Sequence, residues 1–112
     1  MRLHDMSFYI KQHDTTPSLR ADLKNGNADA IDLIGATVRF HMREIGKTTV
    51  IIDASASIIS EAGGTVQYNW ATGDTSDIGS YQAEFEVTYP AGGIETFPND
   101  GYIRIEVIDD IT

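Results

Sequence analysis

Cysteine is absent from the 112-residue sequence, and positively charged residues are scarce. Without a thiol, the chain has no disulfide and no cysteine nucleophile, so it lacks the disulfide that joins the two sheets of antibody domains. The absence of cysteine is compatible with a reducing cytoplasm. Lysine and arginine number 8 against 17 acidic residues, which gives a formal net charge of −9. This imbalance disfavours binding to nucleic acid or to anionic lipid.

Long apolar runs are also missing from the sequence. No segment approaches the roughly 18 apolar residues of a membrane-spanning helix, and the N-terminus lacks the apolar core of a signal peptide. We therefore expect neither membrane insertion nor secretion by a cleaved signal. Hydrophobic residues make up 41% of the chain and charged residues 22%, which is typical of a globular protein. A chain of this length fits a single domain, over residues 1–112.

The motifs of common catalytic and cofactor sites do not occur. The three histidines are dispersed, and there is no zinc motif, phosphate loop or nucleophile elbow. His41 alternates with Arg39 and Arg43 on an expected solvent face, which indicates a surface histidine. Glu84 and Glu86 are close enough to form a glycosidase-like pair, but they lie on an expected hydrated face. We therefore expect no enzymatic activity, no catalytic residue and no cofactor.

Several loop aspartates leave one metal alternative open. Calcium takes oxygen ligands from loops, and these acids could gather at one end of a sandwich. They follow no recognised ligand spacing, so solvated loop acids are the favoured interpretation. The residues are Asp74, Asp77, Asp100, Asp109 and Asp110.

A tyrosine corner is the most informative feature that the sequence does contain. Asp77 and Gly79 precede Tyr81, whose ring is expected to enter the core while its hydroxyl bonds to main chain nearby. Apolar and polar residues then alternate, which is typical of a strand with one buried face. The inward-facing positions would be Tyr81, Ala83, Phe85, Val87 and Tyr89.

Short strands separated by turn residues account for most of the chain. Alternation and β-branched residues predict the strands, while glycine, proline and asparagine predict the breaks between them. The expected strands cover residues 8–12, 19–24, 38–43, 49–52, 66–70, 81–89, 94–97 and 102–108, with a short edge piece at 30–33 and a weak strand or loop at 54–60. We predict an all-β fold, an immunoglobulin-like antiparallel β-sandwich of about seven to nine strands.

The edges and ends of such a sandwich are candidates for contacts with other proteins. An edge strand has unpaired main-chain groups that can pair with a partner strand. The candidate edges are residues 49–52 and 103–108. Residues 1–7 and 109–112 are expected to form short flexible arms that extend onto a neighbour.

Exposed aromatic residues add further candidates. Tyr9 and Tyr102 are opposite in parity to their apolar neighbours, so they are possible anchors at an interface. Trp70 shares a face with apolar residues, which favours a place in the core, although an exposed aromatic row would suit a sugar. The possible interface residues are Tyr9, Val50, Ile51, Ile52 and Tyr102.

Six segments together carry a family resemblance. They are residues 8–14, 19–23, 38–42, 79–89, 95–98 and 101–105, which cover most of the chain. Their strand and corner patterns resemble the immunoglobulin-like N-terminal domain of phage upper baseplate proteins. The resemblance implies a virion component that packs against other virion proteins, and it supplies no catalytic residues.

In that family the domain usually precedes a longer region with fibre or receptor-binding parts, whereas this chain ends at Thr112. The expected function is therefore that of a non-enzymatic structural protein of a tailed bacteriophage virion, either a capsid decoration or an adaptor in the tail or baseplate. It would contact other virion proteins in multiple copies, bind no nucleic acid, and be assembled in the bacterial host cytoplasm. The alternative is a carbohydrate-binding module for host adhesion, which would use Trp70 or Tyr102.

Overall fold

Eight β-strands and their connecting turns make up the structure, a computed structural model that describes residues 7–111. The strands are β1 (Ser7–Lys11), β2 (Leu19–Asp22), β3 (Thr37–Glu44), β4 (Val50–Ser60), β5 (Thr65–Tyr68), β6 (Gly79–Thr88), β7 (Ile94–Phe97) and β8 (Ile103–Ile108). The described residues contain no helix, so the predicted all-β class is confirmed. In the same residues there is accordingly no helix long and apolar enough to cross a membrane.

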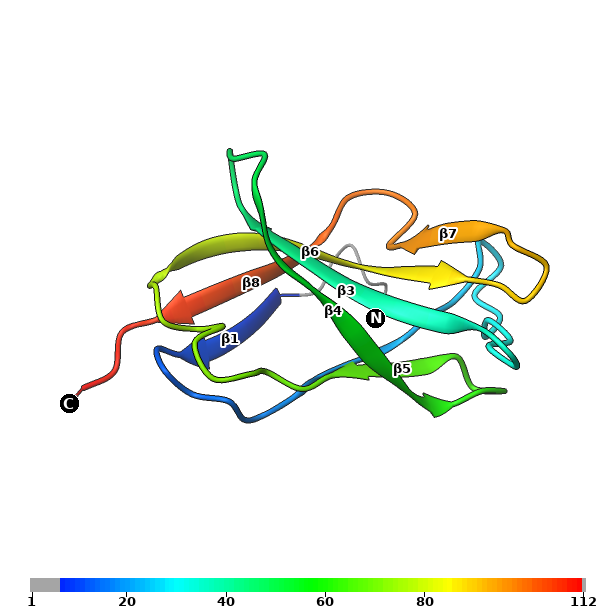
Figure 1. The fold of residues 1–112 in the computed structure, drawn as a ribbon, viewed down its shortest axis with the longest axis horizontal. Helices are drawn as coiled ribbons and strands as arrows, with labels where there is room; N and C mark the ends of the chain where they lie inside the picture. Colours follow the sequence, from blue (N-terminus) through cyan, green and yellow to red (C-terminus); the bar gives the residue numbers. More distant parts are fainter. Residues whose placement is uncertain (1–6, 112) are drawn as a thin grey trace.

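The strands form two sheets that share one strand. The first sheet contains β1, β8, β6, β3 and the first part of β4, hydrogen-bonded in that order, with β7 beside the end of β6. The second sheet contains the last part of β4, followed by β5 and β2. β4 pairs with β3 as far as Ala56 and with β5 from Ser57 onward, so it crosses from one sheet to the other (Figure 1).

This long strand differs from the sequence prediction, which had a strand at 49–52 and a weak segment at 54–60. The structure has one continuous strand of 11 residues. The alanines and serines in its middle have low β-propensity, so they weaken the local signal. Pairing with β3 on one side and β5 on the other supplies the stabilisation that the local sequence lacks.

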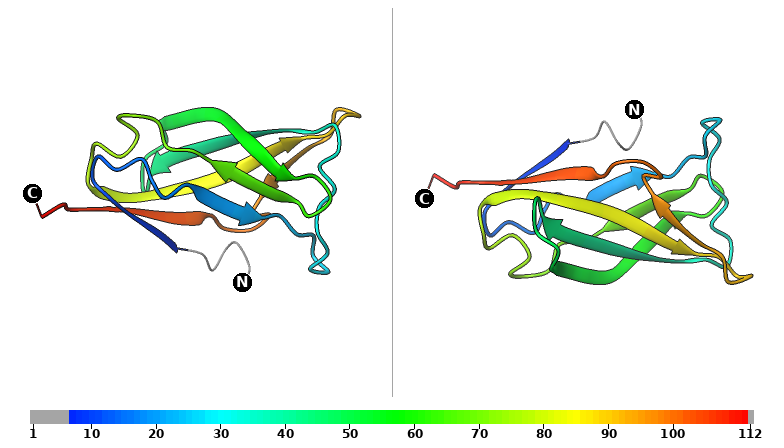
Figure 2. Two further views of the ribbon diagram at one scale, coloured as in Figure 1. Left: turned by 90° about the horizontal axis from the view of Figure 1, so that it is seen from below. Right: turned by 90° about the horizontal axis from the view of Figure 1, so that it is seen from above.

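One strand pair departs from the predicted antiparallel arrangement. β1 runs parallel to β8, with Ile10 beside Val107, while the other pairs of named strands are antiparallel. Figure 2 shows β1 alongside β8 from two sides. Because β8 lies between β1 and β6, the prediction of a free edge at 103–108 was wrong. Alternation reveals which face of a strand is buried, but not which strands flank it.

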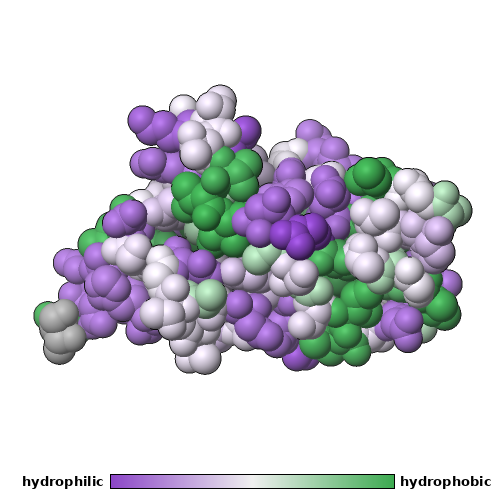
Figure 3. Space-filling view, viewed as in Figure 1, coloured by the Kyte–Doolittle hydropathy of each residue, from purple (hydrophilic) through white to green (hydrophobic). Residues whose placement is uncertain are grey.

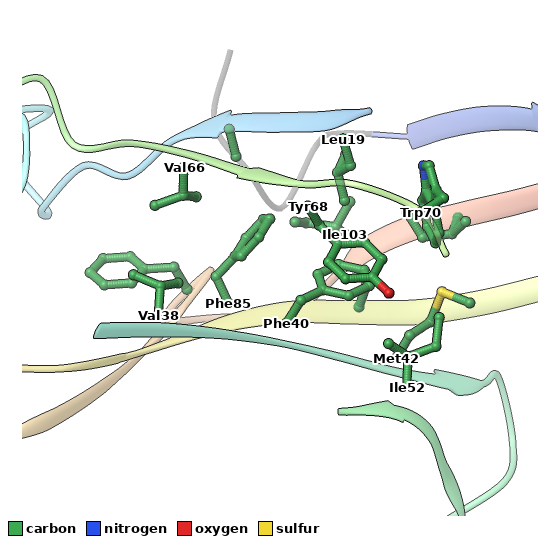
Figure 4. Close-up of a cluster of buried hydrophobic side chains, with 14 of the residues drawn as sticks. Leu19, Val38, Phe40, Met42, Ile52, Val66, Tyr68, Trp70, Phe85 and Ile103 are labelled. Carbon is green, nitrogen blue, oxygen red and sulfur yellow. The ribbon is translucent and has the colours of Figure 1, made fainter. Parts of the chain in front are cut away.

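The core lies between the two sheets, and aromatic rings occupy its centre (Figure 4). Phe40 stacks on Tyr68 with 4.2 Å between ring centroids, and its ring meets Trp70 edge-on at 5.7 Å. Trp70 is 5% exposed, so its predicted place in the core is confirmed. Its indole Nε1 has no hydrogen-bond partner among the residues that the structure describes.

The two predicted arms are only partly covered by the structure. Residues 1–6 and Thr112 lie outside the described residues, and Ser7 already belongs to β1. After β8 the chain continues through residues 109–111 without a strand, and Ile111 is 95% exposed.

Candidate functional site

The predicted apolar edge divides between the surface and the core. Val50 and Ile51 are about half exposed, at 53% and 50%, whereas Ile52 is buried opposite Met42. The side chain of Ile52 therefore belongs to the core, and only its main chain lies at the open edge. The pairing of β4 with β3 shifts between Met42 and Arg43, and this irregularity leaves two consecutive apolar side chains outside.

The first part of β4 is an open sheet edge. Over Val50 to Ala56 it pairs with β3, and among the described residues no other strand pairs with this part. The edge predicted at residues 49–52 is therefore confirmed, and it continues further along β4. The strand has no proline or lysine to discourage pairing with another strand.

A groove of about 510 Å³ lies on the outer face of the first sheet. It runs from the root of the β3–β4 hairpin to the loop between β7 and β8, and it brings Val50 and Tyr102 to the same depression. Figure 3 shows apolar surface at the root of this hairpin, with hydrophilic surface beside it. Its lining residues are His41, Met42, Arg43, Val50, Asp53, Gln82, Ala83, Glu84, Gly101 and Tyr102.

A network of charged side chains includes His41, Asp53 and Glu84 of the groove lining. Arg39 Nε donates to Asp53 Oδ1 at 2.8 Å, and His41 Nε2 lies 3.2 Å from the same oxygen. His41 Nδ1 lies 3.7 Å from Glu84 Oε1, so the imidazole sits between two carboxylates. The hydrogen bond from Arg39 lowers the pKa of Asp53 below its ordinary value. His41 lies on the outer face, as predicted, but it is half-buried and has charged neighbours.

A second row of polar contacts crosses the same face. Arg43 Nε donates to Gln82 Oε1 at 2.9 Å. Further along β6, the Ser80 hydroxyl bonds to both carboxylate oxygens of Glu106, at 2.9 and 2.8 Å. The bond from Ser80, together with that from Arg104, lowers the pKa of Glu106. These contacts hold side chains of three neighbouring strands in fixed positions.

Tyr9 lies on the outer face of the first sheet but is not among the residues of the groove. Its side chain is 63% exposed, and its backbone is in register with Glu106 of β8. The structure thus brings Val50 and Tyr102 to one groove. Ile51 follows Val50 in the chain, whereas Tyr9 lies at a separate place.

The residues predicted for the tyrosine corner lie at the entry to β6. Tyr81 is 6% exposed, and its hydroxyl donates a hydrogen bond to the main-chain carbonyl of Asp77 at 2.7 Å. A β-carbon on Gly79 would lie in ordinary contact with the Tyr81 ring, at 3.5 Å. Burial raises the pKa of Tyr81, and the carboxylates of Asp77 and Glu44 raise it further.

The loop aspartates considered for calcium do not form a common cluster. Within residues 7–111, no group of three histidine, aspartate or glutamate side chains is arranged to hold a metal ion. Asp74 instead accepts hydrogen bonds from the Tyr68 hydroxyl at 2.5 Å and the Ala71 amide at 2.8 Å, which closes the turn after β5.

Sequence reasoning missed the charged network, although part of its signal was present. The alternation in β3 put Arg39, His41 and Arg43 on one face, and the alternation in β6 did the same for Glu84 and Glu86. Their contact depends on the register that sets His41 opposite both Glu84 and Asp53. No local pattern in the sequence gives that register.

Comparisons with known proteins identify the family and a structural neighbour. Residues 3–98 match the family model described as the BppU N-terminal domain. Among curated proteins, no significant sequence match was found. Among solved structures, the fold is similar to the crystal structure of CopC from Methylosinus trichosporium OB3b, with a TM-score of 0.54 and 9% identity over 96% of this chain and 88% of that chain. At this identity the likeness concerns the fold alone.

The family match extends from before β1 to the end of β7, so it includes most of both sheets. It also agrees with the resemblance carried by the strand and corner patterns. Because the match covers well over half of the sequence, the chain belongs to the BppU N-terminal domain family, whose members are structural components of phage baseplates.

Proposed function

We propose that the chain is a non-enzymatic adaptor of the baseplate, present in several copies, which joins neighbouring virion proteins through protein contacts. Membership in a baseplate family favours an adaptor over a capsid decoration. We further propose that the two-layer β-structure is an immunoglobulin-like sandwich. Its packed sheets hold the edge strands in place, which suits a protein that joins neighbours. The site of action is the virion, after assembly in the bacterial host cytoplasm.

The open edge of β4 is the observation that carries this proposal. Its unpaired side can accept a strand from a partner, which is a common way for proteins to join without a large preformed interface. Ala54, Ser55 and Ala56 have small side chains, so a partner strand can approach closely. Exposed Val50 and Ile51 offer apolar area at the start of this edge.

The charge of the chain indicates the chemistry of the partner. With a net charge of −9, the chain repels acidic surfaces and attracts basic ones. Along the open edge, the negative charge of Asp53 is compensated by Arg39, so it does not oppose an approaching strand. We therefore expect a basic partner surface, with binding that weakens as salt increases.

Binding of the purified chain to baseplates that lack it tests this proposal. We expect Ile51→Lys to weaken binding about tenfold, because a charged side chain at a sheet edge discourages pairing. Ile78→Lys is the matched control, since Ile78 is exposed to the same extent, 52% against 50%, and lies outside the strands. It should change binding less than about twofold.

Cosedimentation measures the binding, and electron cryomicroscopy shows where bound copies lie. Circular dichroism checks that both variants are folded. The proposal predicts ordered copies at repeated baseplate positions, with β4 against a neighbour. Equal loss of binding in the two variants, or no binding by the folded wild-type chain, contradicts it.

A further inference from the structure

We propose that the groove on the outer face of the first sheet binds a neutral oligosaccharide. The groove adjoins the open edge of β4 and shares Val50 and Asp53 with it, but most of its lining comes from β3, β6 and the loop before β8, so variants in those parts test the two proposals separately. The groove volume of about 510 Å³ lies within the range of small-ligand sites, about 300 to 1,000 Å³. Its lining includes the aliphatic Val50 and the aromatic Tyr102.

The polar groups of the groove match the hydroxyl groups of a sugar. Asp53, Gln82, Glu84 and Arg43 each end in a planar group with two polar atoms side by side. Adjacent hydroxyls on a sugar ring can bond to both atoms of such a group, because each hydroxyl donates one hydrogen bond and accepts others. The ring of Tyr102 offers an apolar surface on which the C–H face of a sugar can pack.

Contacts within the protein already hold these groups in position. Arg39 and His41 fix Asp53, His41 lies against Glu84, and Arg43 bonds to Gln82. A carboxylate can accept about four hydrogen bonds, so the two contacts to Asp53 Oδ1 leave capacity for a ligand. A site that is ordered before binding loses less conformational entropy when the ligand arrives.

Charge selects a neutral ligand over an acidic one. The groove contains the cationic Arg43 and the anionic Asp53 and Glu84, with His41 between the two carboxylates. The surrounding chain has a net charge of −9, which repels phosphates and acidic sugars. Most of the groove is lined by side chains on the face of the sheet, from β3 and β6, whose main-chain groups are already paired within the sheet.

Nuclear magnetic resonance titration of the purified chain provides the test. The probes are three neutral trisaccharides, maltotriose, cellotriose and triacetylchitotriose, each added to about 10 mM so that weak single-site affinities are detected. We expect at least one of them to shift the amide signals of residues 41–43, 82–84 and 101–102. The absence of such shifts with all three sugars overturns the proposal.

Tyrosine variants locate the site. Tyr102→Ala should weaken binding of the active trisaccharide about tenfold, whereas Tyr102→Phe should keep most of the affinity because it retains the ring. Tyr9→Ala is the matched control, since Tyr9 is exposed on the same face and outside the groove. Equal effects of Tyr102→Ala and Tyr9→Ala contradict the proposal.

The edge variant separates the saccharide site from the adaptor function. Ile51→Lys should leave the trisaccharide affinity within about twofold of wild type, although it weakens baseplate binding. Shifts that concentrate along residues 54–56 would instead place the sugar at the open edge and overturn the assignment to the groove.

Discussion

Tyr81 belongs both to the core and to the turn before β6, because its ring is buried while its hydroxyl bonds to the carbonyl of Asp77. The bond is partly buried, so the carbonyl loses stabilisation when its donor is removed. This one hydroxyl therefore couples the packing of the aromatic ring to the conformation of the turn.

Tyr81→Phe should lower the free energy of unfolding by about 1 kcal/mol, because it removes this hydrogen bond and keeps the ring. Urea unfolding followed by tryptophan fluorescence measures the change. Tyr9→Phe, at an exposed position, should change stability by less than about 0.5 kcal/mol. Equal stability of Tyr81→Phe and wild type contradicts a structural role for the hydroxyl.

At single positions the sequence predicts burial well where alternation is regular. Tyr81, Ala83, Phe85 and Val87 are all buried, as the alternation indicates, and Tyr89 at the end of the series is partly buried. Ile52 is the counterexample, because an irregularity in strand pairing decides which residue of an apolar run turns inward. Such an irregularity depends on the partner strand, and an uninterrupted apolar run does not reveal it.

At the scale of the elements, β4 joins the two sheets, and the turn that follows it leads into β5 of the second sheet. Gly64 in this turn has a φ of +67°, and its carbonyl accepts a hydrogen bond from the Leu23 amide at 2.8 Å. A β-carbon at this position would lie 2.7 Å from the Leu23 carbonyl oxygen and 2.8 Å from that of Ile31. Both the backbone conformation and the close approach of neighbouring main chain thus require glycine.

Gly64→Ala should lower the free energy of unfolding by about 3 kcal/mol, because left-handed strain and a clash with main chain add together. Gly73→Ala is the control. Gly73 also has a positive φ, +93°, but has open space around it, so its cost should be about 1 kcal/mol. Thermal unfolding followed by circular dichroism compares the two, and an equal loss contradicts the role of the close approach.

The sequence predicted most strand positions, but it did not predict strand order, direction or the length of β4. Order and direction depend on contacts between distant segments, such as β1 with β8. The groove escaped prediction for the same reason, since its lining comes from β3, β4, β6 and the loop before β8. Tyr102 and Val50 were both singled out, yet only the folded sheet places them around one groove.

For the whole molecule, folding lowers the pKa of some carboxyl groups and raises the pKa of some tyrosine hydroxyls. A hydrogen bond from Arg39 lowers the pKa of Asp53, and a hydrogen bond from Ser80 lowers the pKa of Glu106. Burial raises the pKa of Tyr68 and Tyr81, and burial together with Glu95 raises that of Tyr89 to about 12. The folded state therefore favours ionised carboxylates and neutral tyrosines.

Stability should be greatest between these two regions of pH. A lowered carboxyl pKa stabilises the fold above the ordinary value of about 4, and this contribution is lost as pH falls through the folded value. A raised tyrosine pKa stabilises the fold below the ordinary value of about 10, and the contribution disappears as pH rises toward 12 for Tyr89.

Urea unfolding across this pH range measures the effect, with tyrosinate absorbance as a second signal. We expect the free energy of unfolding to decline above about pH 10, and Tyr68→Phe to reduce the steepness of that decline. A free energy of unfolding that stays constant into the alkaline range contradicts the prediction.

The parallel pairing of β1 with β8 also determines how the molecule responds to force. The two strands lie side by side from Ser7 beside Arg104 to Lys11 beside Ile108, and both run in the same direction. Tension applied through the segment before β1 and the segment after β8 pulls them past each other along their length. Their interstrand hydrogen bonds then share the load, whereas unzipping would break them one at a time. A protein held at these two ends would resist stretching in shear.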